Sequence, residues 1–255
     1  MKFSYEDLIS GDAIYVDGVG HLRSPQLKEL KPTQGIGTWN YNLFLSMLSW
    51  DKQEFINFFQ TLTKKKLKKL EKNPKITVFD AMILIDESRK LLHNAMAFFI
   101  CEDLIWDAKN YRFAACVDND PKKIIGYISR DNFDDVKDMI LQLNYIGVDE
   151  KAAPTSHSSD KAKELWEKAQ QYLKECRAKA KPKEGYSLGN IISKMCAAPT
   201  GYNLSNIYEL TVFQLYDQFF QYGYLRAMNL NEMAFSNHGG KNFDMQAWIK
   251  PILKK

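Results

Sequence analysis

Apolar residues recur along the chain at two periods, and together these predict a mostly helical α+β fold. Near the start, Ala13–Val16 and Val19–Leu22 flank Asp17-Gly18, a tight-turn pair, so the pattern predicts an N-terminal β-hairpin. In the middle of the chain, three short apolar runs separated by turn residues predict a small antiparallel meander. These runs are Leu104–Trp106, Tyr111–Val117 and Lys123–Ile128.

Most other apolar residues are spaced as on one face of an α-helix. Capping signals precede several of these segments: Ser24-Pro25, Thr38, and Asp51 with Glu54. The stretch Val78–Ile100 predicts either two helices or one kinked helix. The remaining predicted helices are Gln26–Leu30, Trp39–Ser49, Lys52–Lys72, Asn132–Leu143, Asp160–Lys181 and Leu188–Ala197.

The stretch from Asn206 to Ile249 carries the densest aromatic pattern. Asn206 with Glu209 resembles a capping pair, and the residues behind it predict a helix over Ile207–Met228, then a shorter one over Asn231–Ser236. The longer helix is apolar on two sides, so we expect one side to pack on its own domain and the other to contact a partner. The alternative is that both sides are plain core. The residues expected to contact the partner are Phe213, Phe220, Tyr224 and Trp248.

A composition shift divides the chain. Residues 150–159 are rich in alanine, proline, serine and threonine and lack apolar periodicity, which is typical of a linker. We therefore predict an N-terminal α+β domain over residues 1–149 and a helical C-terminal domain over residues 160–255.

Bulk composition places the chain among ordinary globular proteins. The hydrophobic share is 45% and the charged share 26%, which argues against wholesale disorder. No cysteine pair has C-x-x-C spacing, no cationic-then-apolar leader follows Met1, and no apolar run is long enough for a membrane span. These features predict a reduced protein of the cytoplasm with no membrane partner.

The sequence contains no strong motif for a metal, phosphate-binding or catalytic site. The four histidines are scattered, there is no H-E-x-x-H motif, and the glycine pairs Gly18/Gly20 and Gly35/Gly37 lack the lysine of a phosphate-binding loop. Cys101, Cys116 and Cys196 lie in apolar contexts and read as small core residues. We therefore expect no catalytic residues, no metal and no cofactor.

Two lysine-rich segments, residues 64–75 and 160–183, suggest a second interpretation, nucleic-acid binding. Residues 64–75 carry seven lysines and one glutamate, and Lys64, Lys65, Lys68 and Lys69 form the densest patch. Clustered cations attract phosphates, but residues 64–75 contain no interleaved aromatic residues that would stack on bases. Nucleic-acid binding is thus the less favoured function, and the net charge of +4 does not change that.

A loose pattern of apolar, glycine and aromatic positions runs over most of the chain, in segments 8–12, 18–30, 126–133, 140–144, 210–219 and 242–248. In this pattern the chain resembles a group of phage-encoded proteins from tail gene modules, the tail assembly chaperones of long-tailed bacteriophages.

This resemblance implies a mostly helical, non-catalytic protein of the host cytoplasm. Chaperones of this kind bind the tape measure protein, keep it soluble, recruit tail tube subunits and leave before the virion is complete. Tape measure proteins are long helices with apolar faces, so recognition of a helix in a groove is the expected mode, alongside self-association. Two alternatives stay open: a structural component of the tail or virion, and a nucleic-acid-binding accessory protein that uses the lysine-rich helices.

Overall fold

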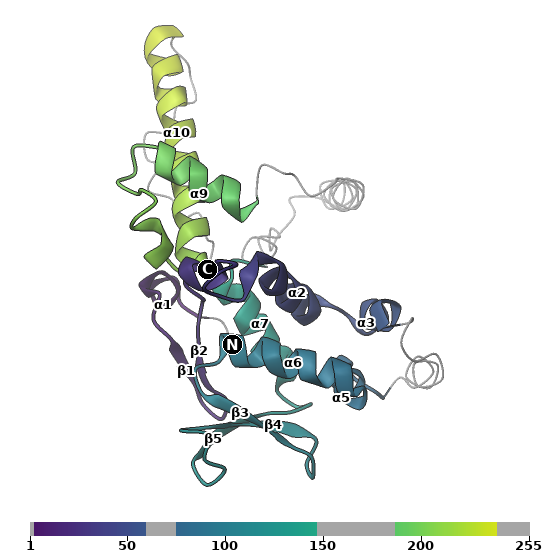
Figure 1. The fold of residues 1–255 in the computed structure, drawn as a ribbon. Helices are drawn as coiled ribbons and strands as arrows, with labels where there is room; N and C mark the ends of the chain where they lie inside the picture. Colours follow the sequence, from purple (N-terminus) through teal and green to yellow (C-terminus); the bar gives the residue numbers. More distant parts are fainter. Residues whose placement is uncertain (1–2, 60–74, 147–186, 239–255) are drawn as a thin grey trace. The chain divides into compact units, whose positions relative to one another are not determined.

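The computed structural model describes residues 3–59, 75–146 and 187–238, and the chain divides into two units (Figure 1). The first unit contains residues 1–146 together with Tyr208–Gln214. The second contains residues 147–207 and 215–255. The segment 208–214 thus belongs with the N-terminal part of the chain, although it lies inside the predicted C-terminal domain. The predicted linker at 150–159 and the predicted helix Asp160–Lys181 lie outside the described residues.

The predicted N-terminal hairpin is confirmed. Helix α1 (Tyr5–Ser10) precedes strands β1 (Ile14–Val16) and β2 (Gly20–Leu22), which pair antiparallel across the Asp17-Gly18 turn. Gly18 has a φ of 72°, the left-handed region that favours glycine. Its carbonyl accepts a hydrogen bond of 2.8 Å from the Tyr127 backbone N–H, which joins the turn to the central sheet.

Three helical segments follow: the 3₁₀ helix η1 (Leu27–Leu30), α2 (Gly37–Ser49) and α3 (Lys52–Phe59). The predicted Asp51–Glu54 cap of α3 is confirmed, because each side chain accepts a hydrogen bond from the other residue's backbone N–H, at 2.8 and 2.9 Å. Thr38, by contrast, is the second residue of α2 and not its cap. The predicted extension of α3 to Lys72 lies outside the described residues.

The stretch Val78–Ile100 forms two helices, α5 (Val78–Leu84) and α6 (Asp86–Phe99). Ile85 lies between them in an extended conformation, with φ −108° and ψ 124°. Thr77 and Asp80 form a reciprocal capping box at the start of α5. The choice between two helices and one kinked helix is therefore settled in favour of two.

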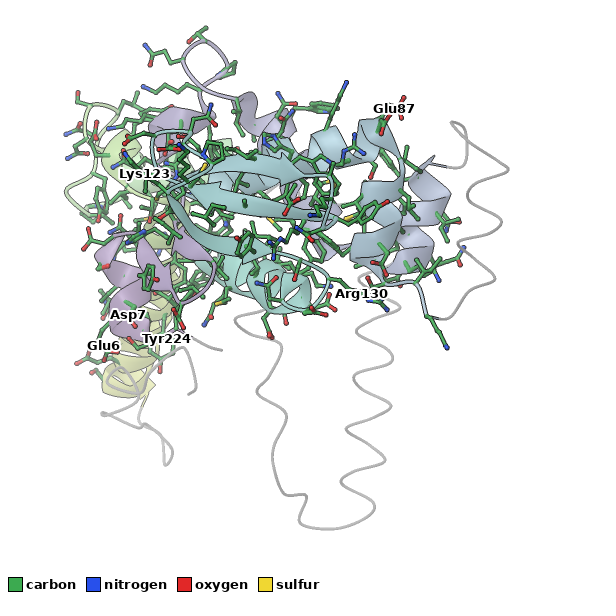
Figure 2. All side chains as sticks on the ribbon, turned by 90° about the horizontal axis from the view of Figure 1, so that it is seen from below. Glu6, Asp7, Glu87, Lys123, Arg130 and Tyr224 are labelled. Carbon is green, nitrogen blue, oxygen red and sulfur yellow. The ribbon has the colours of Figure 1, made fainter. Side chains whose placement is uncertain are left out.

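The middle of the chain forms the predicted meander of strands β3 (Asp103–Asp107), β4 (Arg112–Cys116) and β5 (Ile124–Ile128), in the order β3-β4-β5. Helix α7 (Phe133–Leu143) follows it. Phe113, fully buried on β4, has aromatic neighbours from both the sheet and the helices, which places the core between them. These neighbours are Phe79, His93 and Trp106, with ring centroids 5.0–6.4 Å away. In Figure 2, charged side chains such as Glu87, Lys123 and Arg130 lie at the edge of this unit.

The C-terminal elements are α9 (Leu188–Ala197), the 3₁₀ helix η3 (Ile207–Glu209) and the long helix α10 (Val212–His238). Two predictions about this region are wrong. The long helix begins at Val212 and not at Ile207, and Asn231–Ser236 is part of it and not a separate helix. The fold class is as predicted: mostly helical α+β, with a hairpin, a meander and a helical C-terminal half.

Candidate partner-binding surface

Helix α10 begins at a cap that the N-terminal segment completes. Thr211 and Gln214 form the local part: the Gln214 backbone N–H donates to Thr211 Oγ1 at 3.2 Å, and the Thr211 N–H donates to Gln214 Oε1 at 2.9 Å. The two amides between them are satisfied from a distance. The Val212 N–H donates to the Pro25 carbonyl at 2.9 Å and the Phe213 N–H to Ser24 Oγ at 3.2 Å. All four amides that a helix start leaves unpaired are thus accounted for.

These contacts correct two predicted caps. Asn206 does not cap α10; its Oδ1 accepts a hydrogen bond from the Asn203 backbone N–H in the preceding turn, at 2.8 Å. Ser24 does act as a cap, but for α10 and not for the neighbouring segment Gln26–Leu30. The 3₁₀ helix there instead has Gln26 and Glu29 in the capping positions.

Further contacts hold segment 208–214 in the first unit. The Gln214 side-chain amide donates to the Ile9 carbonyl at the end of α1, at 2.9 Å. Lys28 forms an ion pair with Glu209 at 2.7 Å, and the Lys31 ammonium lies 3.9 Å from the centre of the Tyr208 ring. The root of α10 is therefore fixed by side chains more than 170 positions away in the sequence.

Phe213, one of the four residues predicted to contact a partner, is fully buried in the first unit. Its ring centroid lies 5.1 Å from that of Tyr145, next to α7. Phe213 is therefore a core residue of this unit, and it takes no part in the proposed contact surface below.

The other predicted contact residues have different positions. Phe220 and Tyr224 are half-buried on the part of α10 that belongs to the second unit, and the Phe219 and Phe220 rings are 5.5 Å apart. Trp248 and the basic patch of Lys64, Lys65, Lys68 and Lys69 lie outside the described residues.

Two exposed apolar residues of α10 were missed by the sequence reasoning. Leu225 is 49% exposed and Met233 61% exposed, and Asn229 lies between them at the i, i+4, i+8 spacing of one helix face. The spacing of Leu225 and Met233 was visible in the sequence. The prediction instead followed the rows of aromatic residues on the other sides of the helix. The face that Leu225 and Met233 share presents apolar side chains to water.

Residues earlier in the same helix, by contrast, are buried. Leu215 and Asp217 are almost fully buried, and burial raises the pKa of the Tyr216 hydroxyl above its ordinary value. Residues 215–217, the first that α10 contributes to the second unit, therefore form core. The exposed face begins further along, at Leu225.

The most organised polar group outside α10 is His21 with Glu102. The Glu102 carboxylate accepts a hydrogen bond from the His21 backbone N–H at 2.8 Å and binds the ring Nδ1 at 2.6 Å. Only 7% of the Glu102 side chain is exposed, whereas 45% of the His21 side chain is. This arrangement fixes the orientation of the imidazole ring on β2.

Three cysteines lie in the described part of the chain, and one of them, Cys101, is next to Glu102 in the sequence. Neighbouring Cys101 is exposed, which corrects its predicted place in the core, and Cys196 is half-buried. Partial desolvation raises the pKa of the Cys101 thiol; Arg23 opposes that rise, and Glu102 and Glu29 add to it. Burial likewise raises the pKa of Cys116, which is a core residue as predicted. The reactive thiolate is disfavoured at both positions.

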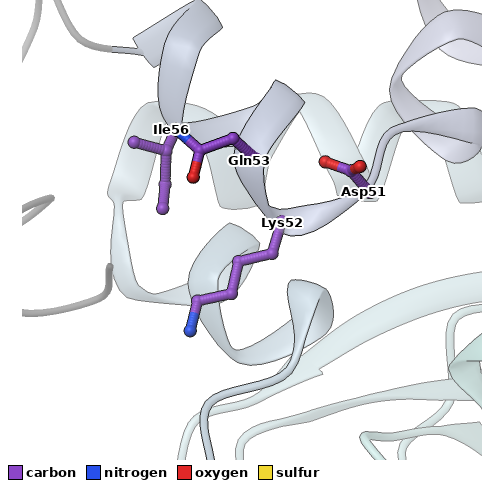
Figure 3. Close-up of a pocket in the computed structure, with 4 residues that line it drawn as sticks. All are labelled: Asp51, Lys52, Gln53 and Ile56. Atoms are coloured by element: carbon purple, nitrogen blue, oxygen red, sulfur yellow. The ribbon is translucent and has the colours of Figure 1, made fainter. Parts of the chain in front are cut away.

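A hollow beside the start of α3 is the pocket that Figure 3 shows, lined by Asp51, Lys52, Gln53 and Ile56, with a volume of about 320 Å³. It is wide open to solvent and brings no acid–base pair together. Within residues 3–59, 75–146 and 187–238, no three His, Cys, Asp or Glu side chains are placed to hold a metal ion. No helix in the described part of the chain has the length and apolarity to cross a membrane.

In the comparison with known proteins, a family model matches the C-terminal part of the chain. The family model of the YomV second domain, from a phage-type protein family, matches residues 179–253. No curated protein and no solved structure matches the chain. The matched segment includes α9, η3 and α10. Its similarity associates the C-terminal part of this chain with bacteriophage proteins.

Proposed function

We propose that this protein is a bacteriophage tail assembly chaperone that binds the tape measure protein and helps recruit tail tube subunits in the host cytoplasm. The observation that carries the proposal is the match of residues 179–253 to a domain of a phage-type family. The resemblance of several segments to tail-module proteins points in the same direction. The proposal assigns the contact with the partner to the matched C-terminal segment.

The shape of α10 supports a helical partner. The helix has 27 residues, a length of about 40 Å at 1.5 Å per residue. Leu225 and Met233 leave apolar surface exposed on one of its faces, and Phe220 and Tyr224 lie half-buried four residues apart. Apolar side chains at such spacing are how a helix recognises another amphipathic helix. A tape measure protein, long and helical, offers many such segments.

Contacts within the first unit fix the first turn of this helix. The amides at its start are satisfied by Thr211, Ser24 and Pro25, and Phe213 in the first turn is buried. A helix whose first turn is fixed in this way loses less conformational freedom when its later turns bind a partner. The proposal therefore gives the first unit a supporting role.

A structural component of the virion is the alternative to be separated from a chaperone. Quantitative mass spectrometry of infected-cell lysate and of purified virions separates the two. We expect the protein to be abundant in the lysate and depleted from the virions, because an assembly chaperone leaves before the particle is complete. A fixed number of copies per virion would contradict the proposal and identify a structural component.

A further inference from the structure

Helix α2 presents an uncharged face to solvent. From Pro32 to Trp50 the sequence contains no aspartate, glutamate, lysine, arginine or histidine, although 26% of the whole chain is charged. Trp39, in the first turn of α2, is 74% exposed and is the most exposed large apolar side chain among the described residues. Depletion of charge together with exposed aromatic residues is the compositional signature of a protein interface.

Two exposed residues, Trp39 and Ser46, and two half-buried ones, Leu43 and Trp50, form a regular stripe along α2 and the residue that follows it. Trp39, Leu43, Ser46 and Trp50 follow one another at intervals of four, three and four residues, the spacing of a helix–helix seam. Phe58 of α3 extends the stripe, because its ring lies 4.6 Å from that of Trp50 and its side chain is 51% exposed. The opposite side of α2 is core, formed by Tyr41, Phe44, Leu45, Met47 and Leu48.

We propose that this stripe is a contact surface for a second copy of the same chain, which packs its own α2 antiparallel across a two-fold axis. A charged partner would find no counter-charge between Pro32 and Trp50, whereas two identical uncharged faces approach without repulsion. A two-fold contact also needs a surface that is complementary to itself.

The order of residues in the stripe meets that condition. Antiparallel pairing about the middle of α2 places Trp39 of one copy beside Trp50 of the other. The same register places Leu43 beside Ser46, a large side chain against a small one, twice in the dimer. Alternation of large and small residues allows two helices to interlock closely. In a parallel arrangement each residue would meet its own counterpart, and the bulky Trp39 side chains would meet each other.

Sedimentation analysis of the full-length protein tests this inference. Over about 1–100 µM, the range suited to a small interface, we expect the native protein to shift from monomer to dimer. The variant Trp39→Glu puts a charge into the stripe and should weaken the dimer by at least about tenfold in dissociation constant. Ser46→Glu should do the same at the centre of the contact.

Leu204→Glu is the matched control, because Leu204 is 68% exposed but lies in the second unit, away from α2 in the sequence. It should leave the dimer unchanged. Circular dichroism checks that all three variants stay folded, as expected for changes at exposed positions. A native protein that is monomeric throughout overturns the inference and leaves another segment of the chain or a different protein to cover the stripe. A dimer that survives Trp39→Glu and Ser46→Glu overturns it as well. Neither outcome bears on the binding of a tape measure protein.

Discussion

Phe213→Ala is expected to lower the free energy of unfolding by about 3–5 kcal/mol, the usual cost of removing a fully buried phenylalanine ring. The side chain has no exposed surface and lies against Tyr145, so its loss leaves a cavity in the first unit. Urea unfolding of the full chain, followed by circular dichroism, measures the change.

Phe220→Ala is the control for this substitution. The same ring is removed from the same helix, but Phe220 is half-buried, so part of its surface already contacts water. Its loss should cost clearly less stability. Equal losses at both positions would contradict the division of α10 into a buried start and a more exposed continuation.

Gly126→Ala is expected to destabilise the protein by about 1–3 kcal/mol through overpacking. A Cβ atom at this position would lie 2.5 Å from the backbone of Gly18 and Val19. Backbone atoms cannot rotate away as a flexible side chain can, so the hairpin turn must move. That movement strains the hydrogen bond from the Tyr127 N–H to the Gly18 carbonyl. Thermal unfolding measures the effect.

Gly223→Ala provides a control of opposite sign. Gly223 lies inside α10, and a Cβ atom there would meet nothing within 4 Å. Alanine in a helix interior is favoured over glycine by about 0.5–1 kcal/mol, so this variant should be slightly more stable. If Gly126→Ala were as harmless as Gly223→Ala, the close packing of the hairpin turn on β5 would be wrong.

Local signals account for the parts of the fold that could be predicted. The Asp17-Gly18 turn, the Asp51–Glu54 cap and the alternation in the meander involve residues close in sequence, so their patterns can be read directly. The split between α5 and α6 is a different case. The polar patch after Ile85 allowed both interpretations, and only the extended backbone at Ile85 decides between them.

The start of α10 was predicted wrongly because Asn206 and Glu209 were taken as its cap in place of Thr211 and Gln214, and because the rest of the cap is not local. Asn206 and Glu209 have the right spacing for a cap, but Pro25 and Ser24 bind the amides of Val212 and Phe213. The contact surface was predicted only in part, because the sequence pattern does not separate the buried side of the helix from the exposed side. A helix that is apolar on two sides does not show which side is core, and Phe213 turned out to be buried while Leu225 and Met233 are exposed.

Co-expression with the tape measure protein of the same phage tests the central claim most directly. We expect the native protein to keep the tape measure protein soluble and to co-purify with it. The double variant Leu225→Glu/Met233→Glu should stay folded, because both residues are exposed, but should lose the complex. The control Leu204→Glu, also exposed, should retain it. A tape measure protein that is insoluble with the native chain, or a complex that the double variant forms equally well, would contradict the account.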